Sequence, residues 1–115
     1  MPFRTRSISD NPSLGTAAVQ VDVPEGVVEA SGNFPGPDYT RKPTRVDTHA
    51  KFRNTHATQI LYVAEDATAT ATAYNYLIDG GGEEIVPIPH DLGYFSIIAD
   101  GSATPVTVEF GKHSP

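Results

Sequence analysis

The sequence of 115 residues contains no cysteine, no tryptophan and one methionine, which is the first residue. The absence of cysteine excludes disulfides and thiolate metal ligands, and it is more typical of a protein made in the cytosol than of a small secreted domain. The near absence of methionine argues against a soft, adaptable apolar groove. A chain of this length is expected to form one domain, whose core has to hold it together without covalent cross-links.

Long apolar runs are also missing, so the sequence predicts no membrane-spanning segment. The opening residues, Met-Pro-Phe-Arg-Thr-Arg, contain no apolar h-region and therefore predict no signal peptide. Basic residues are absent from 54–111, which carries eight acidic residues, whereas seven of the eight basic residues lie in the first 53 positions. Because an acidic region repels phosphate backbones, nucleic acid is not an expected partner.

Alternating polarity and closely spaced turn residues are what the sequence does contain. Ten glycines and ten prolines favour many turns and argue against long helices. We expect an all-β fold, a β-sandwich or jelly-roll-like domain of six to seven short strands, because turn signals recur every eight to twelve residues. The expected strands are residues 17–23, 46–53, 59–64, 68–76, 84–89, 94–99 and 105–110, with a possible short return strand at 27–28.

Three of these segments carry sharper predictions. Residues 68–76 alternate threonine and tyrosine with alanine and asparagine, which favours a strand, although a helix capped by Gly80 is the alternative. Pro87 and Pro89 lie two apart and remove N–H groups from the same side, which predicts an edge strand. Residues 94–99 and 105–110 are interpreted as a hairpin around Asp100-Gly101-Ser102, with Val106, Val108 and Phe110 buried.

The remaining segments are expected to lie outside regular structure. Residues 1–15 are polar and are predicted to form an extended N-terminal arm, followed by a single β-sandwich domain at 16–115 whose dense β region is 46–111. Within that domain, residues 31–45 are expected to form a long loop, because 31–43 contain three prolines and two glycines. Phe34 and Tyr39 are the side chains expected to anchor this loop to a surface.

No arrangement of residues predicts catalysis or a bound cofactor. The four histidines, His49, His56, His90 and His113, lack the spacing of a zinc site and are expected to be surface residues. The aspartates of the predicted turns show no Asp-x-Asp spacing of the kind that binds calcium. No nucleophile with a base and an orienting group can be nominated, so we expect a protein that is not an enzyme. The one alternative binding site is a face with Tyr74 and Tyr76, which would act as a stacking platform for sugar rings.

The chain from Asn54 onward resembles a small β-domain of tailed-bacteriophage virion proteins, of the capsid decoration or cement type. The resemblance covers about half of the chain. It rests on Asn54-Thr55, the strand Gln59-Ile60-Leu61-Tyr62-Val63, the segment Tyr76-Leu77-Ile78-Asp79-Gly80-Gly81-Gly82-Glu83-Glu84, the strand Ile85-Val86-Pro87-Ile88 and the closing Leu92-Gly93-Tyr94-Phe95-Ser96-Ile97-Ile98-Ala99-Asp100-Gly101 with Val106-Thr107-Val108. The pair Pro87 and Pro89 and the longer 80–82 turn depart from the family pattern.

This resemblance implies a non-enzymatic virion protein, assembled in the host cytoplasm, which binds the major capsid protein on the outside of the head. It also implies a homo-oligomer, a trimer in preference to a dimer. The alternative is a receptor- or carbohydrate-binding module of a tail or spike. Since capsid surfaces are often acidic, we expect residues 1–45 to make most of the contacts while the acidic remainder faces solvent. The expected partner-binding residues are Arg4, Arg6, Phe34, Tyr39, Arg41, Lys42 and Arg45.

Overall fold

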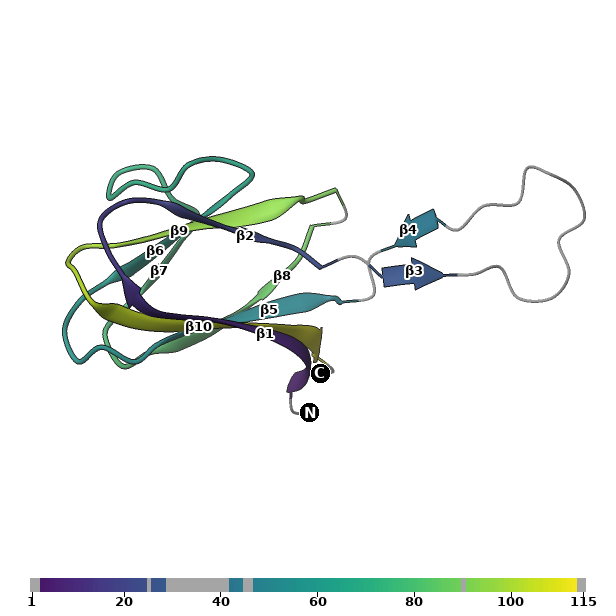
Figure 1. Cartoon of the computed structure of the whole chain (residues 1–115), viewed down its shortest axis with the longest axis horizontal. Helices are drawn as coiled ribbons and strands as arrows, with labels where there is room; N and C mark the ends of the chain where they lie inside the picture. Colours follow the sequence, from purple (N-terminus) through teal and green to yellow (C-terminus); the bar gives the residue numbers. More distant parts are fainter. Residues whose placement is uncertain (1–2, 25, 29–41, 45–46, 90, 114–115) are drawn as a thin grey trace, which may run out of the picture.

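The structure is a computed structural model that describes residues 3–24, 26–28, 42–44, 47–89 and 91–113. Eight strands form two four-stranded antiparallel sheets packed as a sandwich, and no described residue is helical, which confirms the predicted fold class (Figure 1). The described part of the chain accordingly holds no helix that could cross a membrane. In chain order the strands are β1 Phe3–Leu14, β2 Val19–Asp22, β3 Gly26–Val28, β4 Lys42–Thr44, β5 His49–Asn54, β6 Leu61–Glu65, β7 Tyr76–Ile78, β8 Glu83–Pro87, β9 Tyr94–Ala99 and β10 Thr104–His113.

Sheet A has the strand order β1-β10-β5-β8. The predicted edge strand is confirmed, because β8 lies at the margin of this sheet and Pro87 is its last residue. At a sheet edge, the N–H that proline lacks is not needed for pairing with a neighbouring strand. Strand β10 alternates buried Val106, Val108 and Phe110 with half-buried residues, as its sequence pattern predicts. Sheet A is thus built on β10, which pairs with β1 on one side and β5 on the other.

Sheet B has the order β2-β9-β6-β7. The segment 66–75, between β6 and β7, folds over its outer face. The backbone N–H of Ala69 donates to Ser96 Oγ at 2.9 Å, and Ala69 is 1% exposed. Since Phe95 and Ile97 face the core, the intervening Ser96 points to the opposite face, where this loop buries it. The prediction of a strand over 68–76 is therefore wrong except at Tyr76, and the helical alternative is wrong as well.

The core lies between the two sheets and is centred on three phenylalanines. Phe52 and Phe110 come from sheet A and Phe95 from sheet B. The ring of Phe95 meets Phe52 edge-on at 5.0 Å between centroids and lies 6.4 Å from Phe110. Such aromatic pairs add stabilisation beyond their buried area. These ring contacts join the two sheets across the core.

Asn54, at the end of β5, provides a polar link between the same two sheets and is fully buried. Its Nδ2 donates to the carbonyls of Gln59 at 2.7 Å and of Ile78 at 3.2 Å, and its Oδ1 accepts from the N–H of His56. The two accepting carbonyls lie two residues before β6 and at the last residue of β7. The turn that follows β7 contains Gly81, whose φ of 77° is the left-handed conformation that glycine tolerates.

Two further predictions need correction. Strands β9 and β10 lie in different sheets, so the predicted hairpin is instead a crossing from sheet B to sheet A. Residues 3–14 were expected in an arm outside the core, but they form the edge strand β1, with Leu14 1% exposed. The arm prediction failed because a polar edge strand is held by its backbone ladder, which side-chain patterns do not reveal.

The segment predicted as a long loop is only partly described. Strands β3 and β4 pair as an antiparallel ladder from Gly26↔Thr44 to Val28↔Lys42, so the prediction of a loop over 31–45 is wrong at Lys42–Thr44. The β3–β4 pair projects away from the sandwich, at the end where β1 begins and β10 ends (Figure 1). The rest of the loop, 29–41, lies outside the described residues, and so do Phe34 and Tyr39.

Candidate partner-binding site

The N-terminal half of β1 is shaped by a bulge at Arg6. Strand β1 pairs with β10 from Phe3↔His113 onward, and the register shifts between Thr5 and Ser7. A bulge of this kind leaves one residue unpaired and redirects its side chain. Opposite it, a Cβ added to Gly111 would collide with the backbone carbonyl of Arg4. Glycine at this position therefore permits the close approach of β1 to β10.

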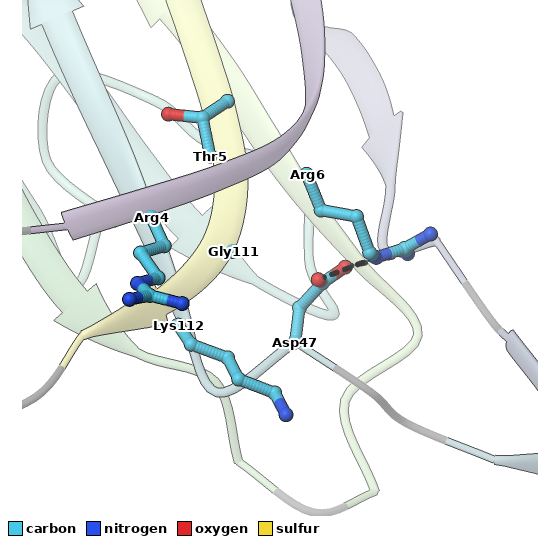
Figure 2. A pocket seen from close by; sticks show the side chains of 6 residues that line it. All are labelled: Arg4, Thr5, Arg6, Asp47, Gly111 and Lys112. Atoms are coloured by element: carbon cyan, nitrogen blue, oxygen red, sulfur yellow. Dashed lines mark hydrogen bonds and ion pairs between the residues drawn. The ribbon is translucent and has the colours of Figure 1, made fainter.

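The bulge borders a pocket of about 270 Å³ at the end of the sandwich from which the β3–β4 pair projects (Figure 2). We call it the basic pocket. Thr5 belongs to the lining, and its hydroxyl is engaged with Glu109, since Thr5 Oγ1 donates to Glu109 Oε1 at 2.5 Å. The lining holds the cations Arg4, Arg6 and Lys112 and the carboxylate of Asp47, which gives it a net charge of +2 in a chain whose total charge is −6. The lining residues are Arg4, Thr5, Arg6, Asp47, Gly111 and Lys112.

One side of the basic pocket is a bidentate ion pair between Arg6 and Asp47. Arg6 donates from Nε to Asp47 Oδ1 and from Nη2 to Asp47 Oδ2, both at 2.7 Å. The Asp47 side chain is 1% exposed, whereas Arg6 is 45% exposed. The hydrogen bond to Asp47 raises the pKa of Arg6 above its ordinary value. Asp47 lies two residues before the first residue of β5, so this pair ties the start of β5 to the bulge in β1.

The other side of the basic pocket carries two cations that face each other across the ladder. Arg4 and Lys112 are direct register partners, and both are exposed. Like charges directly opposite one another on antiparallel strands are destabilising. Neither side chain has an acidic partner among the described residues. Figure 2 shows the Arg4 guanidinium next to the aliphatic part of Lys112, whose ammonium extends away from it along the same side of the pocket.

The other two basic side chains that the structure describes are neutralised. Lys51 Nζ lies 3.4 Å from Glu83 Oε2. Arg53 contacts Glu83 at 3.3 Å and Glu109 at 3.8 Å. Among the basic side chains that the structure describes, Arg4 and Lys112 are thus the two without an acidic partner, and both lie at one end of the sandwich.

Near this end, His49 and His113 form an aromatic pair with ring centroids 5.3 Å apart. Thr48 Oγ1 and His49 Nδ1 are 2.8 Å apart, while His113 Nδ1 is buried without a hydrogen-bond partner. Burial, and secondarily the neighbouring His113, lowers the pKa of His49 below its ordinary value. The folded protein therefore favours neutral His49.

Stability is accordingly expected to fall as the pH drops through the range just below 6.5. The unfolded chain, whose histidines have ordinary pKa values, binds protons there more readily than the folded protein does, so stability increases with pH. The measurement is urea denaturation at pH 7.5, 6.5 and 5.5. The variant His49→Gln should lose less stability over this range than the unmodified protein. Equal losses in both would show that His49 is not responsible.

A second exposed surface lies on the outer face of sheet B. The ring of Tyr74 packs against Tyr62 at 4.9 Å between centroids, and Tyr62 is the register partner of Leu77. Tyr74 is 41% and Leu77 40% exposed. The predicted platform of Tyr74 with Tyr76 is wrong, because Tyr76 packs against the core and its hydroxyl donates to Glu65 Oε2 at 3.2 Å. Tyr62 takes its place beside Tyr74.

The structure brings together two of the seven residues predicted to bind a partner, Arg4 and Arg6. Lys42 is the first residue of β4, and Phe34, Tyr39, Arg41 and Arg45 lie outside the described residues. Sequence reasoning missed Asp47 and Lys112. Lys112 follows the long acidic region, and only the pairing of β1 with β10 brings it to Arg4. The sequence signal that was available was its isolation as the one cation after residue 53.

In the described part of the chain, no three His, Asp or Glu side chains are grouped so as to hold a metal ion. Two of the turn aspartates bond instead to distant backbone. Asp66 accepts from the N–H groups of Gly93 and Tyr94, and Asp100 from that of Ile60. Comparisons with protein-family models, curated proteins and solved structures find no significant match to this chain. A functional assignment therefore has to come from the geometry and the sequence.

Proposed function

We propose that this chain is a non-enzymatic structural protein of a bacteriophage particle, a decoration protein that binds the outer surface of the capsid. In this proposal the end of the sandwich with the basic pocket and the β3–β4 pair contacts the major capsid protein. The protein acts as a homo-oligomer, a trimer in preference to a dimer, in the assembled virion. The observation that carries the proposal is that Arg4 and Lys112, the two cations without an acidic partner among the described side chains, both lie at that end.

Electrostatics supports this orientation. An acidic partner surface repels the acidic part of the chain and attracts Arg4 and Lys112, because complementary charges steer association and fix its direction. The projecting β3–β4 pair adds a second contact beside the pocket (Figure 1). Lys51 and Arg53, on sheet A, contribute little to this attraction, because Glu83 and Glu109 already neutralise them.

The test is binding to heads purified from phage that lack this protein. The double variant Arg4→Gln with Lys112→Gln should lose about tenfold or more in affinity, equivalent to about 1.4 kcal/mol. The control, Lys51→Gln with Arg53→Gln, removes the same number of positive charges from paired positions and should change affinity less than about twofold. Equal losses of affinity in the two double variants would show that binding depends on the net charge of the protein and not on the basic pocket. Unchanged binding in both would contradict the proposed contact surface.

The second candidate is a carbohydrate-binding module of a tail or spike, which the Tyr62–Tyr74 pair favours. Exposed aromatic rings offer apolar faces on which sugar rings can stack. A glycan array should then give defined hits that disappear in Tyr62→Ala and in Tyr74→Ala. The control Ile8→Ala alters an apolar side chain that is 60% exposed in sheet A and should leave the hits unchanged. An array without hits rules out this candidate for the glycans tested.

A further inference from the structure

The pair of Arg4 and Lys112 is unfavourable for the protein alone. Antiparallel neighbours with like charges repel, and no described acid compensates them. An acidic side chain at either position would have removed the repulsion. The structure instead places two cations on register partners that line the same pocket. An anion that enters the pocket would relieve this repulsion. Binding of an anion would therefore stabilise the pairing of β1 with β10.

The pocket already contains one example of the chemistry that it accommodates. Asp47 occupies the Nε and Nη2 donors of Arg6 in a planar, bidentate arrangement. Guanidinium groups favour this geometry with carboxylates. Arg4, two residues before Arg6 on the same strand, presents the same kind of group with no described carboxylate bound to it. Lys112 supplies a second positive charge beside it, without a geometric preference of its own.

The dimensions of the pocket restrict the ligand. Its volume of about 270 Å³ is below the range of roughly 300–1,000 Å³ that is usual for sites that enclose a small molecule or cofactor. Two unpaired cations are too few to follow a nucleic-acid backbone, and the rest of the chain is acidic. A single short side chain fits these limits.

We propose that the basic pocket recognises the carboxylate of an acidic side chain on a partner protein, which binds between the Arg4 guanidinium and the Lys112 ammonium. The Arg6–Asp47 pair forms the adjoining wall and holds β1 in place. This inference rests on the proposed function, since it names the chemical group on the partner surface that the pocket takes. It implies that the partner contributes Asp or Glu at the point of contact.

The experiment is an NMR titration of the ¹⁵N-labelled protein with a blocked tripeptide, Gly-Glu-Gly, and its neutral counterpart, Gly-Gln-Gly. The glutamate peptide should shift the Arg4 Nε–Hε signal and the Gly111 and Lys112 amide signals, with saturation. The glutamine peptide should shift them less than one fifth as much at the same concentration. Arg4→Gln with Lys112→Gln should abolish the response and raise Tm slightly, because the repulsion is gone. Lys51→Gln with Arg53→Gln should respond like the unmodified protein.

A third titration, with inorganic phosphate, distinguishes a carboxylate site from a phosphate site. Phosphate that binds more than ten times as tightly as the glutamate peptide would overturn the carboxylate assignment in favour of a phosphate site. Equal shifts with both peptides, or an unchanged response in Arg4→Gln with Lys112→Gln, would overturn it as well. Arg6 is kept in every variant because its removal would leave the buried Asp47 carboxylate unpaired.

The titration tests the ligand of the pocket and the particle-binding experiment tests the contact surface, so either proposal can be contradicted without the other. A carboxylate response without any loss of particle binding in Arg4→Gln with Lys112→Gln would uphold the pocket chemistry and contradict the proposed contact surface. Loss of particle binding without a carboxylate response would uphold the contact surface and overturn the assignment of its ligand.

Discussion

Replacement of Phe52 by alanine is expected to lower the free energy of unfolding by about 3–5 kcal/mol, through lost burial and the cavity left behind. Phe52 is fully buried, and its ring meets Phe95 edge-on across the two sheets. Since a domain of this kind has a total stability of roughly 5–15 kcal/mol, the variant should be close to unfolding at physiological temperature. Urea denaturation at 15 °C, followed by circular dichroism, measures the loss.

Phe52→Leu is the matched control, because it keeps an apolar side chain and removes the ring. It should retain much of the stability that the alanine variant loses, since partial filling leaves a smaller cavity. A loss below about 1 kcal/mol for Phe52→Ala would contradict the packing of the two sheets through this residue.

The second large effect is expected at Asn54. Replacement by alanine removes both Nδ2 donors and the Oδ1 acceptor, and should cost about 2–4 kcal/mol, because the backbone carbonyls of Gln59 and Ile78 lose their bonds in a buried site. Asn54→Asp keeps the shape of the side chain but turns a carboxylate oxygen toward those carbonyls. At pH 7 it should therefore be the less stable of the two variants.

The pH dependence distinguishes these two variants of Asn54. Burial should raise the pKa of the introduced carboxyl above that of the unfolded chain, so the folded variant binds the proton more tightly. The stability of Asn54→Asp relative to Asn54→Ala should thus be greater at pH 4 and should decrease as the pH rises toward 7. Urea denaturation of both variants at the two pH values checks this. A constant difference between them would show that water or a rearranged loop reaches position 54.

Sequence patterns predicted those elements in which alternation coincides with burial. Val106, Val108 and Phe110 line the core as expected, and the two prolines at 87 and 89 marked an edge strand. Both signals are local, because they depend on the chemistry of residues two apart on one strand. The pairing partner of a strand is not a local property. The same turn residues at 100–103 suit a hairpin and a crossing between sheets, so the sequence did not separate the two.

The failures at 68–76 and at β1 have different physical causes. In 68–76 the alternating residues are mostly threonine and alanine, which are both small and differ little in burial, so the pattern defined no apolar face. The position of this loop depends on the bond from Ala69 to Ser96, which is distant in sequence. In β1 almost every side chain is polar or exposed, and the ladder with β10 holds it. The basic pocket was only half predicted for the same reason, since Lys112 reaches Arg4 through that ladder.

The pairing of the first strand with the last also sets the order in which the protein can fold. Sheet A joins β1, β10, β5 and β8, none of which is next to its neighbour in the chain. During synthesis β1 has no partner until residues 104–113 have been made, and the basic pocket does not exist before then. Such distant pairings slow folding, since long segments must close before any contact forms. The end with the basic pocket is thus completed only when β10 has been made, and a chain truncated before β10 would keep an unpaired edge on β5 as well as an unattached β1.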